Sequence, residues 1–156
     1  MMFKPAIGYV GVGLMGLPMT KHLLSLGYTV RAYDIVRAQR DAARSAGAAI
    51  AESPTAATEG ADFVLLNLPT TDAVEAAVFG DNGVARALRP PQLVIDFSTV
   101  KVDKGKTFAA KLRADTGCGW VDAPVSAGPP ASGSGALTVM AGGDDADIGT
   151  SRASRH

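Results

Sequence analysis

A glycine-rich turn near the N-terminus constrains the fold of this 156-residue chain more than any other stretch. Residues 6–10 form an apolar run typical of a short buried strand, and residues 14–26 have helical composition. Between them Gly11, Gly13 and Gly16 follow the pattern G-x-G-x-x-G. In a dinucleotide site the first glycine allows a sharp turn, the second lets a pyrophosphate approach the backbone, and the third lets the helix pack on the sheet.

An acidic residue follows this turn at the spacing that a dinucleotide site requires. Asp34 lies 23 positions after Gly11, at the end of a second predicted strand, residues 29–33. A carboxylate there can accept hydrogen bonds from the adenosine ribose hydroxyls. The alternative is a tight strand–helix turn with a surface aspartate. Strand, glycines and Asp34 taken together favour the dinucleotide site.

Charge and composition exclude several other classes of partner. Fifteen basic and fifteen acidic residues give a net charge of zero, so nothing indicates nucleic acid or an acidic membrane surface. Cys118 is the single cysteine, and His22 and His156 are the two histidines, too few for a metal-ligand cluster. No apolar run suggests a signal peptide or a membrane span. We expect a cytoplasmic domain with no metal site.

Strand and helix signals alternate along the whole chain. Further strands are predicted at residues 48–50, 62–68, 93–97, 120–123 and 137–141, and further helices at 36–46, 54–58, 71–78 and from about 100 to 114. Ser53 is expected to cap the helix that begins at Pro54, and Thr71 or Asp72 the next one. The alternation predicts an α/β, Rossmann-type doubly wound, mainly parallel sheet with helices on both faces. Residues 1–143 are expected to form the dinucleotide-binding domain.

Ligands of such sheets lie across the carboxyl ends of the strands. The segments that follow those ends are therefore the candidate site, and they are residues 11–16, 34, 68–69, 98–99 and 124–128.

These segments resemble the β-hydroxyacid dehydrogenase family, which includes 3-hydroxyisobutyrate dehydrogenase and tartronate semialdehyde reductase. Residues 11–19 (GVGLMGLPM) are similar to that family's cofactor signature. Residues 68–70 (LPT) and 96–99 (DFST) match its next two segments, and residues 122–126 (DAPVS) begin its substrate loop. The resemblance covers about residues 6–143. It implies a domain that binds NAD, with NADP as the alternative, and a small hydroxyacid as substrate.

The resemblance also implies a role for each matched position. The glycine turn would hold the pyrophosphate, and the aspartate after the second strand together with the Leu-Pro segment would hold the adenosine side. The Asp-x-Ser-Thr segment would lie by the nicotinamide ribose, and the substrate loop would bind the substrate carboxylate. These residues are, in that order, Gly11, Val12, Gly13, Leu14, Met15 and Gly16; Asp34, Leu68 and Pro69; Thr99; and Ser126 with Gly128. NAD is expected to be preferred because Asp34 would repel a 2′-phosphate. Arg31 and Arg37, close by in sequence, could weaken that preference.

The chain departs from the family pattern in two places. Ala127, Ala131-Ser132 and Ala136 stand where the family usually has Gly, Gly-Ala and Thr. After Gly143 the family continues into an all-α domain through a helix with the pattern Gly-x-x-Gly-x-Gly-x-x-x-Lys-x-x-x-Asn, whose lysine acts as acid or base. Residues 144–156 hold no such pattern and are expected to be a polar tail or the truncated start of that helix. A shortened sequence or a changed reading frame near Ile148 would each account for this.

The lysine-rich helix after Thr99 has two interpretations. Lys101, Lys104, Lys106 and Lys111 are most simply a solvated helix face, and Lys101 or Lys104 could instead replace the missing acid–base group. We assign no catalytic residue. The predicted function is the NAD(P)-binding domain of an oxidoreductase acting on the CH–OH group of a small 3-hydroxyacid. A non-catalytic dinucleotide-binding or regulatory module is the alternative, and homo-oligomers are compatible with both.

Overall fold

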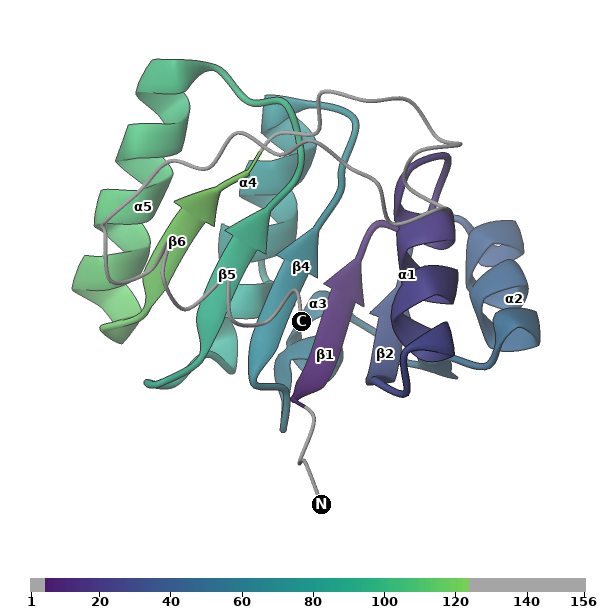
Figure 1. Cartoon of the computed structure of the whole chain (residues 1–156). Coiled ribbons are helices and arrows are strands. Elements are labelled where there is room, and N and C mark those ends of the chain that lie inside the picture. The colour runs from purple at the N-terminus through teal and green to yellow at the C-terminus, as the bar shows by residue number, and fades with distance from the viewer. Residues whose placement is uncertain (1–4, 124–156) are drawn as a thin grey trace.

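Six parallel strands form the centre of the molecule. The computed structural model describes residues 5–123. The strands are β1 (Ala6–Val10), β2 (Thr29–Tyr33), β3 (Ala49–Ile50), β4 (Phe63–Leu66), β5 (Leu93–Asp96) and β6 (Gly119–Asp122). They are ordered β3-β2-β1-β4-β5-β6 (Figure 1). The chain winds outward in one direction from β1 to β3 and in the other from β4 to β6, so the topological switch point lies between β1 and β4.

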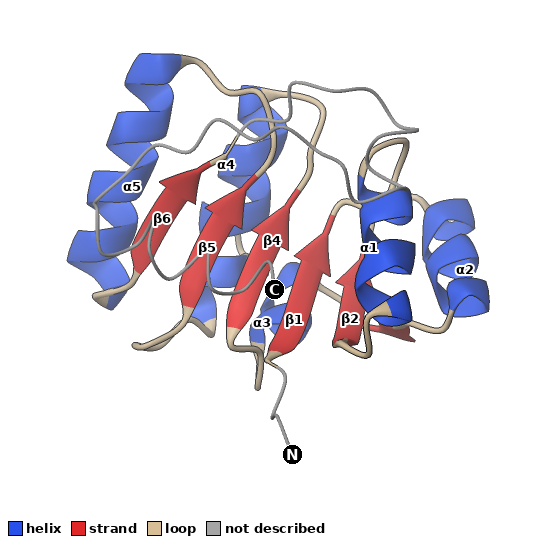
Figure 2. Ribbon diagram, viewed as in Figure 1, coloured by secondary structure: helices blue, strands red, loops and turns tan. Residues whose placement is uncertain are grey.

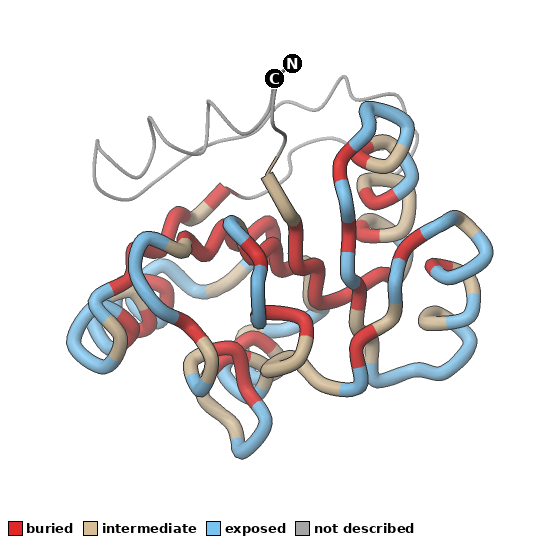
Figure 3. Tube along the Cα trace, turned by 90° about the horizontal axis from the view of Figure 1, so that it is seen from below, coloured by how far each residue is buried: buried red, intermediate tan, exposed pale blue. Residues whose placement is uncertain are grey.

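Helices cover both faces of this sheet (Figure 2). They are α1 (Gly16–Ser25), α2 (Arg37–Ala46), α3 (Pro54–Thr58), α4 (Thr71–Phe79) and α5 (Val102–Thr116), with a 3-10 turn, η1, at Val84–Arg86. Leu23 of α1 and Ala43 of α2 pack in one core cluster with β1 and β2. Val74 and Val78 of α4 pack in a second cluster with Phe108 of α5. The strands contribute residues to both clusters and form a band of buried residues (Figure 3).

The predicted fold class is confirmed, and two local predictions need correction. The strand predicted to reach Leu68 ends at Leu66, because the Leu68 N–H donates to Ser98 Oγ (2.7 Å) and not to a neighbouring strand. Helix α4 is capped by Thr70, not by Thr71 or Asp72. Thr70 is the last extended residue, and its Oγ1 accepts from the Ala73 N–H (3.0 Å).

Other local predictions agree with the structure. Residues 29–33 form β2 as predicted, and Ser53 caps α3 by accepting from the Ala56 N–H (3.0 Å). The predicted strand at 137–141 and the tail at 144–156 lie outside the described residues. Among the helices of residues 5–123, none is both long enough and apolar enough to cross a membrane.

Candidate functional site

The three glycines of the turn occupy different environments. Gly11 has φ +98°, in the left-handed region, and a Cβ there would overlap the Asn67 carbonyl oxygen. A Cβ on Gly16 would overlap the Gly11 carbonyl oxygen. A Cβ on Gly13 would meet nothing within 4 Å. Gly11 and Gly16 are therefore required by the fold itself, whereas Gly13 borders open space.

Asp34 connects the end of β2 to the glycine turn. Its Oδ2 accepts from the Val12 N–H (2.9 Å), and its Oδ1 accepts from the Val36 N–H (2.8 Å). Each carboxylate oxygen has a further lone pair, so the side chain can still accept from a ligand hydroxyl. These two bonds fix the carboxylate at the mouth of the site.

The N-terminus of α1 faces the same place. Its N-cap residue, Met15, makes no side-chain capping bond, and the first turn contains no acidic residue within the part of the chain that the structure describes. The first N–H groups of a helix and the positive end of its dipole attract an anion. A Cβ on Gly13 would meet nothing within 4 Å, so the space beside this terminus is open.

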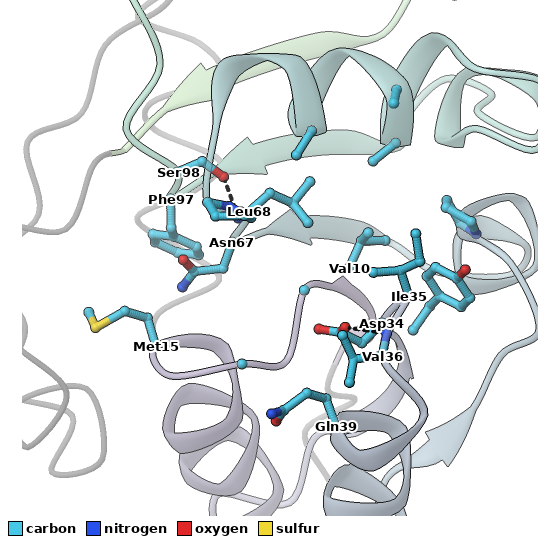
Figure 4. A pocket seen from close by; sticks show the side chains of 18 of the residues that line it. Val10, Met15, Asp34, Ile35, Val36, Gln39, Asn67, Leu68, Phe97 and Ser98 are labelled. Atoms are coloured by element: carbon cyan, nitrogen blue, oxygen red, sulfur yellow. Dashed lines mark hydrogen bonds between the residues drawn. The ribbon is translucent and has the colours of Figure 1, made fainter.

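A pocket of about 830 Å³ extends from this turn across the carboxyl ends of β1, β2, β4 and β5 (Figure 4). One wall is apolar, and a flat aromatic base is the kind of ligand group such a wall can enclose. Ile35 and Val36, in the loop after β2, form this wall. Further apolar lining comes from Pro54 of α3 and from Ala73, Ala76 and Ala77 of α4. Ile35 is 84% exposed although it is a large apolar residue. This wall was not predicted from the sequence. Two apolar residues directly after Asp34 were the available signal.

The opposite wall is held by a chain of hydrogen bonds from β5. Asp96 Oδ1 accepts from the Ser98 N–H (2.9 Å), and Ser98 Oγ accepts from the Leu68 N–H (2.7 Å). The loops after β4 and β5 are thereby tied together. The bond between Ser98 and Leu68 was not foreseen, because these two residues are 30 positions apart in sequence.

Asp96 is fully buried at the end of β5. Burial raises the pKa of its carboxyl to about 7, the hydrogen bonds from Ser98 oppose the rise, and the charge of Asp122 adds to it. Asp122 lies beside Asp96 in register on β6. Within residues 5–123 the second oxygen, Oδ2, has no hydrogen-bond partner. A carboxyl group in such surroundings is poised to take up a proton near neutral pH.

The structure brings most of the predicted cofactor residues to one pocket. Those that line it are Gly11, Gly13, Leu14, Met15, Asp34, Leu68, Pro69 and Thr99. Val12 and Gly16 are buried behind the turn and do not line it. Ser126 and Gly128 lie outside the described residues.

Two other sequence candidates lie away from this pocket. Cys118 is buried immediately before β6, at the amino end of the sheet. In the part of the chain from residue 5 to 123, no group of three His, Cys, Asp or Glu side chains is arranged to hold a metal ion. Lys101 and Lys104 are exposed at the start of α5.

Comparison with known proteins gives matches over most of the chain. The model of the NAD-binding domain of 6-phosphogluconate dehydrogenase matches residues 6–153. An NAD-dependent L-serine dehydrogenase of Pseudomonas aeruginosa is 37% identical over 138 residues, which is 88% of this chain and 46% of that protein. Human mitochondrial 3-hydroxyisobutyrate dehydrogenase is 36% identical over 140 residues, 90% of this chain and 41% of that protein.

A solved structure gives the same result. A 3-hydroxyisobutyrate dehydrogenase of Mycobacterium tuberculosis, solved with L-serine, superposes with a TM-score of 0.90 at 31% identity. The match covers 98% of this chain and 51% of that one. The chain therefore spans about half the length of the relatives that it matches.

Proposed function

We propose that this chain binds and orients the cofactor of a 3-hydroxyacid dehydrogenase. The chain belongs to the β-hydroxyacid dehydrogenase family and carries that family's N-terminal NAD-binding domain. The observation that carries the proposal is the coupling of the glycine turn to Asp34. The Val12 N–H inside the turn donates to the Asp34 carboxylate (2.9 Å), so a phosphate site and a ribose site are built as one unit. Both open into the same pocket.

The residues present fit a dinucleotide part by part. The space beside Gly13 and the α1 N-terminus suits the pyrophosphate. Asp34 suits a ribose with two free hydroxyls, and the apolar wall with Ile35 and Val36 suits the adenine. As the family resemblance implies, Leu68 and Pro69 are assigned to the adenosine side and Thr99 to the nicotinamide ribose.

NAD is the proposed cofactor rather than NADP. Asp34 would repel a 2′-phosphate, and two nearby arginines already donate to backbone carbonyls. Arg31 donates to the Ala56 and Glu59 carbonyls (3.2 and 3.3 Å), and Arg40 donates to the Asp34 and Ile35 carbonyls (2.7 and 3.2 Å). Arg37 is directed along α2 toward Asp41, at 4.0 Å.

Calorimetric titration of the 156-residue chain with NAD and with NADP at fixed salt tests this proposal. We expect NAD to bind at one site per chain and NADP to bind more weakly. Equal or tighter binding of NADP would contradict the preference. A chain that is folded by circular dichroism but binds neither cofactor would overturn the proposed function.

The chemistry proposed for the site is oxidation of a carbinol. Bound NAD supplies the acceptor for the hydride. This chain's residues would hold the cofactor, and the substrate carboxylate is assigned to Ser126 and Gly128. The printed sequence has no lysine after Lys111, so it does not supply the lysine of the family pattern.

The 156-residue chain should therefore turn over hydroxyacids slowly. Without a positioned acid–base group, we expect a rate about 10²–10⁴-fold below that of the Pseudomonas L-serine dehydrogenase assayed alongside it. The assay follows NADH at high protein concentration with L-serine, 3-hydroxyisobutyrate and glycerate. A rate near that of the relative would show that the chain carries its own base. Lys101→Ala and Lys104→Ala would then be the variants to compare.

A further inference from the structure

A polar side chain interrupts the apolar end of β4 inside the pocket. Asn67 directly follows the run Phe63–Leu66, and its N–H donates to the Val10 carbonyl (2.9 Å), which fixes its backbone against β1. Its side chain is half-buried and lines the pocket. Figure 4 shows its carboxamide between Met15 and Phe97, across the pocket from Asp34.

The Asn67 side chain is held from behind by Tyr9. Tyr9 is fully buried near the carboxyl end of β1, and its hydroxyl accepts from Asn67 Nδ2 at 3.5 Å. Burial also raises the pKa of the Tyr9 phenol, so the group stays protonated. A buried hydroxyl without a partner would be costly, so Tyr9 and Asn67 form a coupled pair.

This pair leaves most of the amide available. A primary amide has two N–H donors and an oxygen with two lone pairs, and Tyr9 engages only one of these donors. The carboxamide lies on the side of the pocket where Phe97 lies (Figure 4). The bond to Tyr9 accounts for one donor of the amide and not for its second donor or its oxygen.

The position of Asn67 indicates which part of a dinucleotide it would meet. Asp34, Ile35 and Val36 follow β2, on one side of the glycine turn. Asn67 follows β4, on the β5 side of that turn. If the turn holds the pyrophosphate and Asp34 the adenosine ribose, the other nucleoside must extend toward Asn67. Its ribose hydroxyls and amide can both donate and accept, which matches a carboxamide.

We propose that Asn67, positioned by Tyr9, is a cofactor-binding residue that recognises the nicotinamide-nucleoside half of the dinucleotide. This inference rests on the proposed function, since it takes the pocket to be a dinucleotide site. Neither Asn67 nor Tyr9 belongs to the segments that carry the family resemblance.

Titrations of the full chain with NAD and with ADP separate the two halves of the cofactor, because ADP contains only the adenosine and the phosphates. Asn67→Leu should weaken NAD binding by about 3- to 30-fold, the loss of one or two hydrogen bonds, and leave ADP binding within about twofold. Tyr9→Phe should weaken NAD by a smaller factor in the same selective way. Asn67→Ser serves as a second variant if the leucine impairs folding.

Asn82 provides a matched control. It lines the same pocket from the turn before η1, so Asn82→Leu should change NAD and ADP binding by the same factor. If the NAD-to-ADP affinity ratio of Asn67→Leu and Asn67→Ser equals that of the wild type, the inference is wrong. A purely structural role would give that result together with a lower melting temperature. If the wild-type chain binds neither NAD nor ADP, the proposed function itself fails.

Discussion

Two aspartates at strand ends begin with the same local geometry and end in different surroundings. Asp34, directly after β2, accepts from the N–H two residues ahead, Val36, at 2.8 Å, and Asp96, at the end of β5, accepts from Ser98 at 2.9 Å. This is the turn that an aspartate side chain commonly makes with its own backbone. The second oxygens differ. That of Asp34 accepts from Val12, whereas that of Asp96 has no partner among the described residues.

The difference shows that one local motif can serve two purposes. On the β2 side, Asp34 is half-buried and borders the pocket, so its carboxylate is directed at a ligand and at the glycine turn. On the β5 side, Asp96 is fully buried next to Asp122 and acts through Ser98, which ties the two loops together. The solvent exposure of the aspartate side chain therefore decides whether it can contact a ligand, as Asp34 can, or only supports the structure, as Asp96 does.

The largest expected effect comes from a substitution at the proposed phosphate site in the glycine turn. Gly13→Val should weaken both NAD and ADP by at least about 100-fold, because the branched side chain would fill the space left beside α1. The melting temperature should stay close to that of the wild type, since a Cβ at Gly13 meets nothing within 4 Å.

Gly16→Ala is the matched control for this variant. Its Cβ would overlap the Gly11 carbonyl oxygen, so the free energy of unfolding should fall by about 1–3 kcal/mol or more. Unchanged NAD affinity in a folded Gly13→Val protein would show that the turn is not the phosphate site.

The next effect concerns pH and tests the β5 side. The pKa of Asp96 is raised from 3.8 to about 7 in the folded chain, so the native state binds its proton more tightly than the unfolded state does. The Asp96 contribution to stability is therefore full below pH 4 and falls as the pH rises toward 7, by at most about 4 kcal/mol. Asp96→Asn should remove this slope in urea unfolding measured between pH 4 and 8.

Asp122→Asn sharpens the same measurement. It removes the neighbouring charge but leaves Asp96 buried, so the slope should shrink without disappearing. A wild-type slope identical to that of Asp96→Asn would mean that the Asp96 carboxyl titrates alike in both states.

The smallest expected effect is that of an Asp34 substitution on cofactor affinity. Asp34→Ala should weaken NAD by about 1–3 kcal/mol, the usual cost of leaving hydrogen-bond partners unpaired. It should weaken NADP less, because the repulsion of the 2′-phosphate disappears with the carboxylate. The ratio of the two affinities, measured by titration, is the test, and a ratio equal to that of the wild type would remove Asp34 from cofactor selection.

The fold and the β2 side of the site were largely predictable from the sequence. The glycine spacing, the apolar run of β1 and the position of Asp34 are all local features, and local features can be read without knowing what lies opposite. Gly11, Gly13 and Asp34 border the pocket as expected. The early end of β4 was not predictable, because it depends on Ser98, which takes the Leu68 N–H from 30 residues away.

The sequence by itself determined the order of strands and helices and the turn between β1 and α1, because hydrophobic periodicity and glycine conformation act over a few residues. The tertiary structure alone decided which polar groups meet. Tyr9 and Asn67 are 58 positions apart, and Asp96 and Asp122 become neighbours only through strand register. Burial, which shifts the pKa of Asp96 and couples Asn67 to Tyr9, is a property of the packed sheet and of no single segment.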